Sequence, residues 1–449
     1  MAWDFETDSA YQEDLAWAAE FTRLEVEPLD YVIAHPHDLD DPVRNELIPP
    51  LQAEVRARGL WATHLGPDLG GPGYGQLKLA LLNEIIGRSR CGPIVFGSHT
   101  PDAGNAETLA RYGSSKLKER YLKPLLQNEI TSAIAMTEPQ GGSDPKVFTT
   151  SAHLDEDQHW VLNGRKWFSS NARFSSFLLV MAVTDPSNSQ SQMMSMFIVP
   201  TDSQGVLFIR NVGIADEPPG SGIEGYLEFH DVRIPADHIL GTRGEGFKVA
   251  QSRLSGGRIH HAMRTVGLVK RTFEMMCERA VSRSTQGSLL GDKQLIQQMI
   301  ADSWIQVETL RLLTLQTAWK IDRYQDYSEV RADISAVKAY MQSVCHDVAA
   351  RAIQLHGSLG VTNELPLIRT LIDSFRLGIA DGPTEIHKVA LSRSLLRDVR
   401  PSSDIFPTEH IPAKRIAAED KYREALARAR SVGRSKQPEE APEQARLLQ

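Results

Sequence analysis

Apolar residues recur every three or four positions through the first 130 residues, which is the spacing of helices that bury one face. Gly59 is placed to end one such segment, and Ser114 or Ser115 to cap another. A stretch rich in glycine and proline, residues 66–75, predicts a loop between helices. The first domain, residues 1–130, is therefore predicted to be helical, with helices at 10–26, 47–59, 77–88, 105–112 and 115–127.

The pattern changes near residue 130 to short apolar runs separated by turn residues. Within residues 160–169, Asn163-Gly164 separates two such runs and predicts a two-residue β-hairpin turn. No helical spacing interrupts this region. Residues 131–242 are therefore predicted to form an antiparallel β-barrel or sandwich. Its other strands are predicted at 130–136, 177–184, 194–199, 206–212 and 226–232.

Helical spacing returns at Gly246 and continues in long amphipathic segments joined by short links. This pattern predicts a four-helix bundle over residues 243–400. In the C-terminal extension, residues 401–449, a surface helix is predicted at 413–431 and disorder at 435–449. The predicted fold class is multidomain α+β, in the order helical domain, β domain and helical bundle.

Composition narrows the functional classes. The chain has 449 residues, which is long enough for two or three domains, and a net charge of −8 that argues against a nucleic-acid binder. The longest clean apolar run, residues 177–183, is too short to cross a membrane. The three cysteines are widely spaced without metal-site spacing, and the acidic start resembles no targeting segment. These features predict a cytoplasmic protein with no integral membrane segment and no metal site.

Two stretches carry candidate chemistry. In residues 136–144, Gly141 and Gly142 let the backbone approach a flat ring or a phosphate, and hydroxyl groups add hydrogen-bond donors. Near the C-terminal end of the bundle, Asp381 precedes Gly382 and Pro383, which suit a sharp turn into a new helix. A carboxylate at such a helix mouth can abstract a proton or can simply cap the helix.

These stretches resemble signatures of the acyl-CoA dehydrogenase family, and the resemblance covers residues 1–400. Residues 136–144 match the segment that lies along the flavin, and residues 381–386 match the segment Glu-Gly-Thr-x-Gln-Ile that carries the catalytic base. The resemblance implies FAD as cofactor, oxidation of an acyl-CoA thioester to 2-enoyl-CoA, an electron-transfer flavoprotein as acceptor, and a homodimer or homotetramer.

The resemblance also implies roles for individual residues. Asp381 is the expected catalytic base, with Arg258 beside it, and both are expected to bind substrate together with Gly382 and Ser143. Trp167 and Ser169 belong to a second block, residues 163–171, that runs against the flavin. Five residues are expected to reach the FAD of a neighbouring subunit: Arg283, Gln294, Gln354, Gly357 and Ser358. The remaining expected cofactor contacts are Met136, Thr137, Gly142, Ser143, Trp167, Ser169, Thr384 and Glu385, with the Glu385 N–H aligned to polarise the thioester carbonyl.

The chain departs from the family pattern at several positions. Gln286 replaces a phenylalanine, Ser358 a glycine, and Ile372 an arginine, while Gly257 occupies the alternative base position used by some members. An Asp-Gly-Pro subgroup linked to longer, branched or unusual acyl chains fits best. The adjacent His260 and His261 are predicted to pack or to face solvent. Two alternatives stay open: an oxidase or monooxygenase, since nitroalkane-oxidising relatives also use aspartate, and a flavin-binding protein without turnover.

Overall fold

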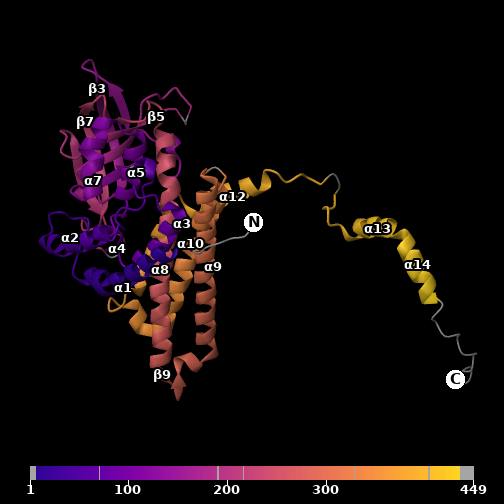
Figure 1. Cartoon of the computed structure of the whole chain (residues 1–449). Coiled ribbons are helices and arrows are strands. Elements are labelled where there is room, and N and C mark those ends of the chain that lie inside the picture. Colours follow the sequence, from indigo (N-terminus) through magenta and orange to yellow (C-terminus); the bar gives the residue numbers. More distant parts are fainter. Residues whose placement is uncertain are drawn as a thin grey trace, which may run out of the picture. The chain divides into compact units, whose positions relative to one another are not determined.

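The computed structural model describes residues 7–69, 71–189, 192–215, 217–327, 329–402 and 405–434. The chain forms two compact units, Met1–Ser394 and Leu395–Gln449. The first unit confirms the predicted order of a helical part, a sheet and a helical bundle (Figure 1).

The N-terminal helices lie close to their predicted positions. The second helix, α2, begins at Pro42 rather than at residue 47, because the Asp41 carboxylate accepts hydrogen bonds from Val43 N and Arg44 N and caps it there. Of the two predicted caps of the last segment, Ser114 and Ser115, the structure shows Ser114, whose hydroxyl accepts from Leu117 N. The helical elements are α1 (Ser9–Phe21), η1 (Thr22–Val26), η2 (Glu27–Tyr31), α2 (Pro42–Ala57), η3 (Pro67–Leu69), α3 (Gly75–Ile86), α4 (Gly92–Val95), α5 (Asp102–Tyr112), α6 (Ser115–Leu117), η4 (Lys118–Leu122) and α7 (Lys123–Gln127).

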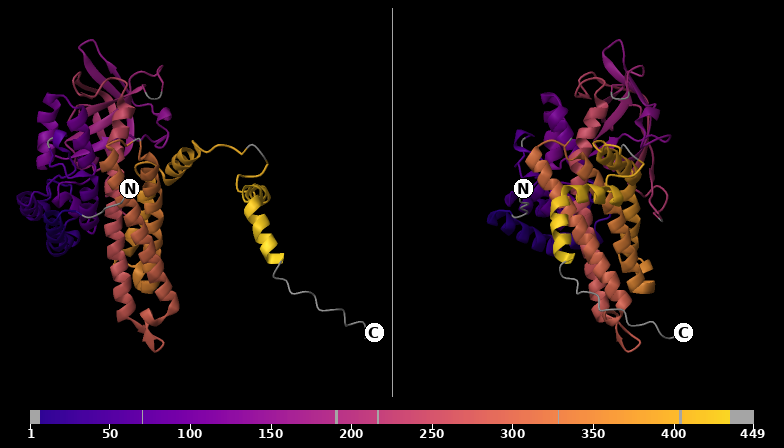
Figure 2. Two further views of the ribbon diagram at one scale, coloured as in Figure 1. Left: turned by 45° about the vertical axis from the view of Figure 1, so that its right-hand side comes forward. Right: turned by 90° about the vertical axis from the view of Figure 1, so that its right-hand side faces the viewer.

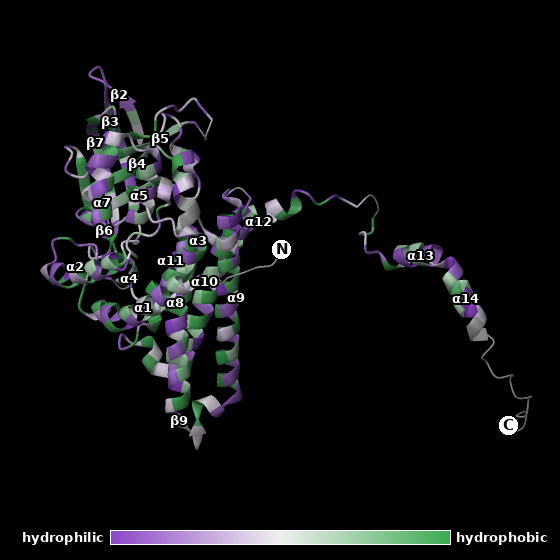
Figure 3. Cartoon of the chain, viewed as in Figure 1, coloured by the Kyte–Doolittle hydropathy of each residue, from purple (hydrophilic) through white to green (hydrophobic). Residues whose placement is uncertain are grey.

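The middle part is one sheet in which the described strands are ordered β6-β7-β3-β2-β4-β5-β8, with β1 pairing β4. Most pairs are antiparallel as predicted, but β1 and β2 run parallel to β4, so the sheet is mixed. Its core is apolar on both faces of β4 and β5, as the colouring in Figure 3 shows. The strands are β1 (Ser132–Ala135), β2 (Ser151–Leu154), β3 (His159–Ser170), β4 (Phe177–Val183), β5 (Met194–Pro200), β6 (Val206–Val212), β7 (Glu224–Pro235) and β8 (Ile239–Leu240), and the 3-10 turns are η5 (Pro145–Val147) and η6 (Ala172–Phe174).

The predicted hairpin at Asn163-Gly164 is wrong, because β3 runs unbroken from His159 to Ser170. The two residues form a bulge against β7, where the register shifts between Leu162 and Gly164. Asn163 exchanges two 2.9 Å hydrogen bonds with Asp231, one from each residue. Trp160, Val161 and Leu162 before the bulge and Lys166 after it are buried, so tertiary pairing outweighs the local turn signal.

The C-terminal part of the first unit is the predicted bundle, built around the 37-residue helix α8 (Figures 1 and 2). Helices α9 and α10 run antiparallel, since Lys320 contacts Asp333 and Gln306 contacts Asp347 and Arg351. Buried residues of α3 join the bundle core. The elements are α8 (Gly246–Ser282), β9 (Ser284–Thr285), β10 (Ser288–Leu289), η7 (Leu290–Asp292), α9 (Gln294–Tyr324), α10 (Arg331–His356), η8 (Gly357–Val361), α11 (Leu367–Ile379) and α12 (Thr384–Leu396).

Among the described residues of the second unit, two helices, α13 (Ile411–Lys421) and α14 (Arg423–Arg434), stand where a single helix over 413–431 is predicted. The interruption falls at Tyr422, which has a φ of −108°. The predicted disorder of residues 435–449 lies outside the described residues.

Candidate active site

The loop after β1 is fastened to β3 through its main chain. Trp167 N donates to Thr137 O at 3.0 Å, and Lys166 Nζ donates to Met136 O at 2.8 Å. Lys166 also pairs with Glu138 at 2.8 Å, and both side chains are buried. The predicted contacts Met136, Thr137 and Trp167 are therefore brought together at the edge of the sheet where β1 ends and its loop lies against β3.

This edge fits a flat heteroaromatic cofactor. The Ser169 hydroxyl is buried and has no hydrogen-bond partner among the described residues, so it is a donor still to be satisfied. A Cβ at Gly142 would come within 3.2 Å of Thr137 Cγ2, so glycine at this position lets the loop pack closely against Thr137. Gly142 and Ser143 are exposed, and the Trp167 ring packs against Phe168 and Tyr226. The donors and ring beside an open loop match the needs of a flavin.

The second part of the site is the turn between α11 and α12. Asp381 and Gly382 have φ values of +55° and +97°, which produce the sharp reversal that the sequence predicts. Thr384, a predicted cofactor contact, is buried and turns its hydroxyl inward to donate to Gly378 O at 3.1 Å. Arg258 Nη2 donates to the main-chain oxygen of Asp381 at 3.2 Å. The arginine therefore holds the turn rather than pairing directly with the carboxylate.

The Asp381 carboxylate lies among cationic and titratable groups. His261 Nε2 is 3.5 Å from its Oδ2 atom. Burial raises the pKa of Asp381, but His261, Arg253, Lys338 and Arg258 together hold that pKa below its ordinary value. The carboxylate is therefore ionised at neutral pH, as a general base must be.

Three of these neighbours, Arg253, His261 and Lys338, were not predicted as site residues. Arg253, Gly257 and His261 are spaced by four residues along α8, so they share one face of the helix. A Cβ at Gly257 would have no heavy atom within 4 Å, so space opens on this face between Arg253 and His261. The four-residue spacing, read together with Asp381, is the sequence signal that could have found them.

The turn at Asp381 and Gly382 (the base turn) and the part of the sheet that carries Met136, Thr137, Trp167 and Ser169 (the flavin edge) are linked through the buried Glu224. Ser170, on β3, donates from Oγ to Glu224 Oε2 at 2.6 Å. Arg376, on α11, lies 3.5 Å from Glu224 Oε1. The helix that ends at the base is thereby tied to the strand that carries Trp167 and Ser169.

The other predicted cofactor contacts lie elsewhere in the chain. Arg283 is exposed and precedes the β9–β10 hairpin, which Figure 1 shows at the end of the bundle remote from the sheet. Because α10 runs antiparallel to α9, Gln354, Gly357 and Ser358 lie at the same end as Gln294. Within a single chain, these five predicted contacts therefore lie far from the flavin edge. Glu385 is exposed in the first turn of α12.

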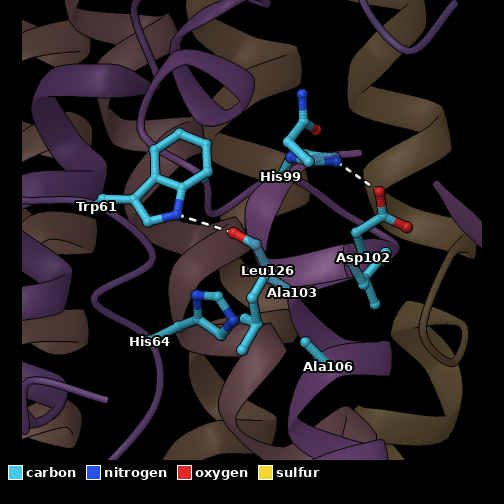
Figure 4. Close-up of a pocket in the computed structure, with 10 residues that line it drawn as sticks. Trp61, His64, His99, Asp102, Ala103, Ala106 and Leu126 are labelled. Atoms are coloured by element: carbon cyan, nitrogen blue, oxygen red, sulfur yellow. Dashed lines mark hydrogen bonds and ion pairs between the residues drawn. The ribbon is translucent and has the colours of Figure 1, made fainter. Parts of the chain in front are cut away.

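A small internal cavity lies beside the site rather than in it (Figure 4). Its volume is about 10 Å³, room for about one water molecule, and Trp61, His64, His99 and Asp102 line it. His99 Nε2 lies 2.6 Å from Asp102 Oδ2. Three hydrogen bonds continue from this pair. Ser132 N donates to Asp102 at 2.8 Å, and the Asn105 side chain donates to Ser132 at 2.9 Å. Arg253 in turn donates to Asn105 at 2.8 Å. This network ties α5 and β1 to the Arg253 end of α8.

A wider recess of about 440 Å³ lies against β2, β4 and the start of β5, and none of the predicted site residues line it. Within the described residues, no cluster of three or more His, Cys, Asp or Glu side chains is arranged to hold a metal ion. No described helix is both long and apolar enough to traverse a bilayer.

Residues 12–129, 133–232 and 244–396 match the N-terminal, middle and C-terminal domains of acyl-CoA dehydrogenases. Acyl-CoA dehydrogenase family member 11 of Rattus norvegicus is 36% identical over 358 residues, which cover 78% of this chain and 45% of that protein. The chain thus spans about half the length of that relative. The Mycobacterium tuberculosis protein named "Probable acyl-CoA dehydrogenase FadE2" is 35% identical over 388 residues, covering 84% and 94%.

Solved structures agree with these matches. Butyryl-CoA dehydrogenase from Megasphaera elsdenii superimposes with a TM-score of 0.74 at 26% identity, covering 88% of this chain and 100% of that one. The FAD complex of PigA gives 0.75 at 25% identity, covering 88% and 99%. The order of a helical domain, a sheet and a helical bundle is the architecture of this class of flavoproteins. The chain belongs to the acyl-CoA dehydrogenase family, and FAD is the cofactor of this enzyme class.

Proposed function

We propose that the chain is an acyl-CoA dehydrogenase that converts an acyl-CoA thioester to 2-enoyl-CoA, with Asp381 as the base. The observation that carries the proposal is the ionised, partly exposed carboxylate of Asp381 at a left-handed turn, 3.5 Å from His261 on α8, the helix on which Gly257 leaves open space. The substrate would be a medium-to-long or branched acyl chain, on the strength of the Asp-Gly-Pro resemblance.

In this reaction the Cα–H bond breaks and its proton passes to the Asp381 carboxylate. The N–H of Glu385, at the start of α12, would donate to the thioester carbonyl and stabilise the charge that develops there. Bound FAD supplies the acceptor for the hydride that leaves Cβ. Arg258 would keep the base turn in place through its bond to Asp381 O.

Residues of the flavin edge would hold the ring. Thr137 and Ser169 would donate to ring oxygen and nitrogen atoms, Trp167 would stack, and Met136, Gly142 and Ser143 would line the loop around it. Ser143, Gly382 and Arg258 would also contact the acyl-CoA. The Asp381 side chain is 28% exposed, so a bound substrate could reach the carboxylate and lose its Cα proton to it.

Residues at the remote end of the bundle would complete the site of a second subunit. Arg283 suits a pyrophosphate because its planar guanidinium pairs with two oxygens at once, and it is exposed in the single chain. Gln294, Gln354, Gly357 and Ser358 would act at the same contact. The proposal therefore includes a homodimer or homotetramer, with an electron-transfer flavoprotein as the electron acceptor.

The test is anaerobic titration of the FAD-loaded protein with a panel of CoA esters that vary in chain length and branching. Wild type should lose its flavin absorbance with at least one ester. Asp381→Asn should retain bound FAD and show no bleaching. Retained bleaching in Asp381→Asn would reject Asp381 as the base. Oxygen uptake without reduction of an electron-transfer flavoprotein would instead indicate an oxidase, and FAD binding without bleaching by any ester would indicate a protein without turnover.

A further inference from the structure

His261 lies where it can control the orientation of the proposed base. It is one helical turn beyond Gly257 on α8, and its Nε2 atom is 3.5 Å from Asp381 Oδ2. The exposed fractions of the two side chains are 27% and 28%, so neither is sealed in the core, and a Cβ at Gly257, one turn before His261, would meet no heavy atom within 4 Å. This distance is longer than a hydrogen bond, and catalytic contacts commonly shorten when substrate is bound.

The protonation state of His261 decides what this contact can do. Burial, together with Arg264, Lys338 and Arg253, lowers the pKa of His261 to about 4, although the charge of Asp381 opposes the change. The imidazole is therefore neutral at pH 7 and carries a single N–H. Because an ionised carboxylate only accepts hydrogen bonds, the tautomer that suits this contact has its proton on Nε2.

The other charged or titratable groups around the base bind elsewhere. Arg253 Nε donates to Asn105 Oδ1 at 2.8 Å, and Lys338 Nζ donates to Leu377 O. Arg258 donates to the main-chain oxygen of Asp381, and His387 Nε2 lies 3.4 Å from that same oxygen. These groups hold the turn in place, and the cations among them lower the pKa of Asp381. His261 instead faces an oxygen of the reacting carboxylate.

We infer that His261 is a positioning residue for proton abstraction. Its Nε2–H donates to Asp381 Oδ2 and selects the carboxylate rotamer that leaves Oδ1 directed at the substrate carbon over Gly257. The inference rests on the proposed function, because it assigns an orientation to the same base. It replaces the sequence-based expectation that His261 only packs or faces solvent.

The test compares three variants of the full-length, FAD-loaded protein in stopped-flow flavin reduction, with the CoA ester that reduces wild type fastest. His261→Phe keeps the size of the ring and removes the donor. The expected reduction rate is about 10- to 100-fold lower, since a misaligned base loses the near-attack geometry. The apparent Kd for the ester should stay within about twofold, because the change affects orientation rather than binding. His261→Gln, which restores an N–H at similar reach, should recover most of the rate.

The matched control is His260→Gln, on the adjacent residue of α8, which is buried near His64 and Arg264. This variant should keep the wild-type reduction rate and pH profile. In His261→Phe the acidic limb of the profile should move to higher pH, because one of the groups that lower the Asp381 pKa is gone. A purely structural role for His261 would lower the protein yield or stability without moving that limb.

A second measurement does not use the flavin. Histidine-selective 15N spectra at pH 7 should show the Nε2-protonated tautomer for the resonance that disappears in His261→Phe. An Nδ1-protonated tautomer, or a reduction rate in His261→Phe equal to wild type, would overturn the inference. Absence of bleaching in wild type would reject the proposed function instead, and the tautomer would then decide the inference alone.

Discussion

Lys166 Nζ lies 2.8 Å from Glu138 Oε1 inside the sheet, and the exposed fractions of the two side chains are 0% and 1%. Glu138 also accepts from Thr149 N and Thr150 N. Burial lowers the pKa of Lys166 to about 8, while its pairing with Glu138 opposes that change. Lys166 Nζ also donates to the main-chain oxygen of Met136, the first residue of the loop after β1, so the charged pair supports the proposed flavin edge.

Breaking that pair from one side should be costly. Lys166→Met leaves a buried, unpaired carboxylate and should lower the free energy of unfolding by about 3–5 kcal/mol. The double variant Lys166→Met with Glu138→Leu should recover much of the loss, because both charges are gone. Urea denaturation of the FAD-free protein measures this. The exposed pair Lys116–Asp237 is the control, since Lys116→Met should cost about 1 kcal/mol or less. An equal cost at both lysines would contradict this account.

Ser169→Ala separates cofactor binding from stability. The Ser169 hydroxyl is buried without a described partner, so its removal should leave the FAD-free protein as stable as wild type or about 1 kcal/mol more stable. The affinity for FAD should fall about two- to tenfold, since one hydrogen bond to the ring is lost. Denaturation of the FAD-free protein and fluorescence titration with FAD give the two numbers. Ser132→Ala should instead destabilise, because Ser132 Oγ donates to Asp102 at 2.5 Å.

Gly257→Ala should stabilise the protein and impair the reaction. Alanine is favoured over glycine within a helix by about 0.5–1 kcal/mol, and the new Cβ would meet no heavy atom within 4 Å. The same methyl group would occupy substrate space, so the apparent Kd for branched esters should rise more than that for straight-chain ones. Gly267→Ala on the same helix is the opposite control, because its Cβ would lie 2.2 Å from Glu84 O. Unchanged Kd values for every ester would remove Gly257 from the site.

Arg283→Ala and Asp381→Asn should complement each other in mixed oligomers. Each variant alone should be inactive or weakly active. In a mixed dimer, one of the two sites combines an intact Asp381 with an intact Arg283 from its neighbour. Random one-to-one pairing therefore predicts roughly a quarter of the wild-type activity, because half of the dimers are mixed and each has one intact site. Flavin reduction after co-expression measures it, and activity no greater than the sum of the separate variants would place Arg283 outside the shared site.

The protein should lose stability as the pH falls below about 6.5. Burial lowers the pKa of His37 and His64 to about 3 and that of His387 to about 4. Between these values and 6.5, the unfolded chain binds protons that the folded protein does not, so the free energy of unfolding decreases with decreasing pH. Melting temperatures from pH 7.5 to 4.5 report this slope. His64→Leu should flatten it, whereas His230→Gln, at an exposed position, should not.

The fold was largely predictable because helices α1 to α7 and the bundle carry regular apolar spacing with local caps such as Ser114. The turn at Asp381 was predictable because Gly382 and Pro383 mark it in the local sequence, whereas the role of Asp381 as the base stays a prediction. The hairpin at Asn163-Gly164 was not, since its local signal was overruled by Asp231, 68 positions away. His261 was missed for a similar reason, because its neighbour in space, Asp381, is 120 positions away in the sequence. The adjacent His260 gives no sign of which of the two histidines faces a carboxylate.

The turn that carries the proposed base is held by bonds to main-chain oxygens, from Thr384 to Gly378 O and from Arg258 to Asp381 O. Such anchoring does not depend on which side chain stands at the tip. Asparagine or glycine, which tolerate the left-handed φ of +55° at this position, can consequently replace the acid while the turn is kept, which makes this corner of the molecule a natural starting point for acquiring a different chemistry.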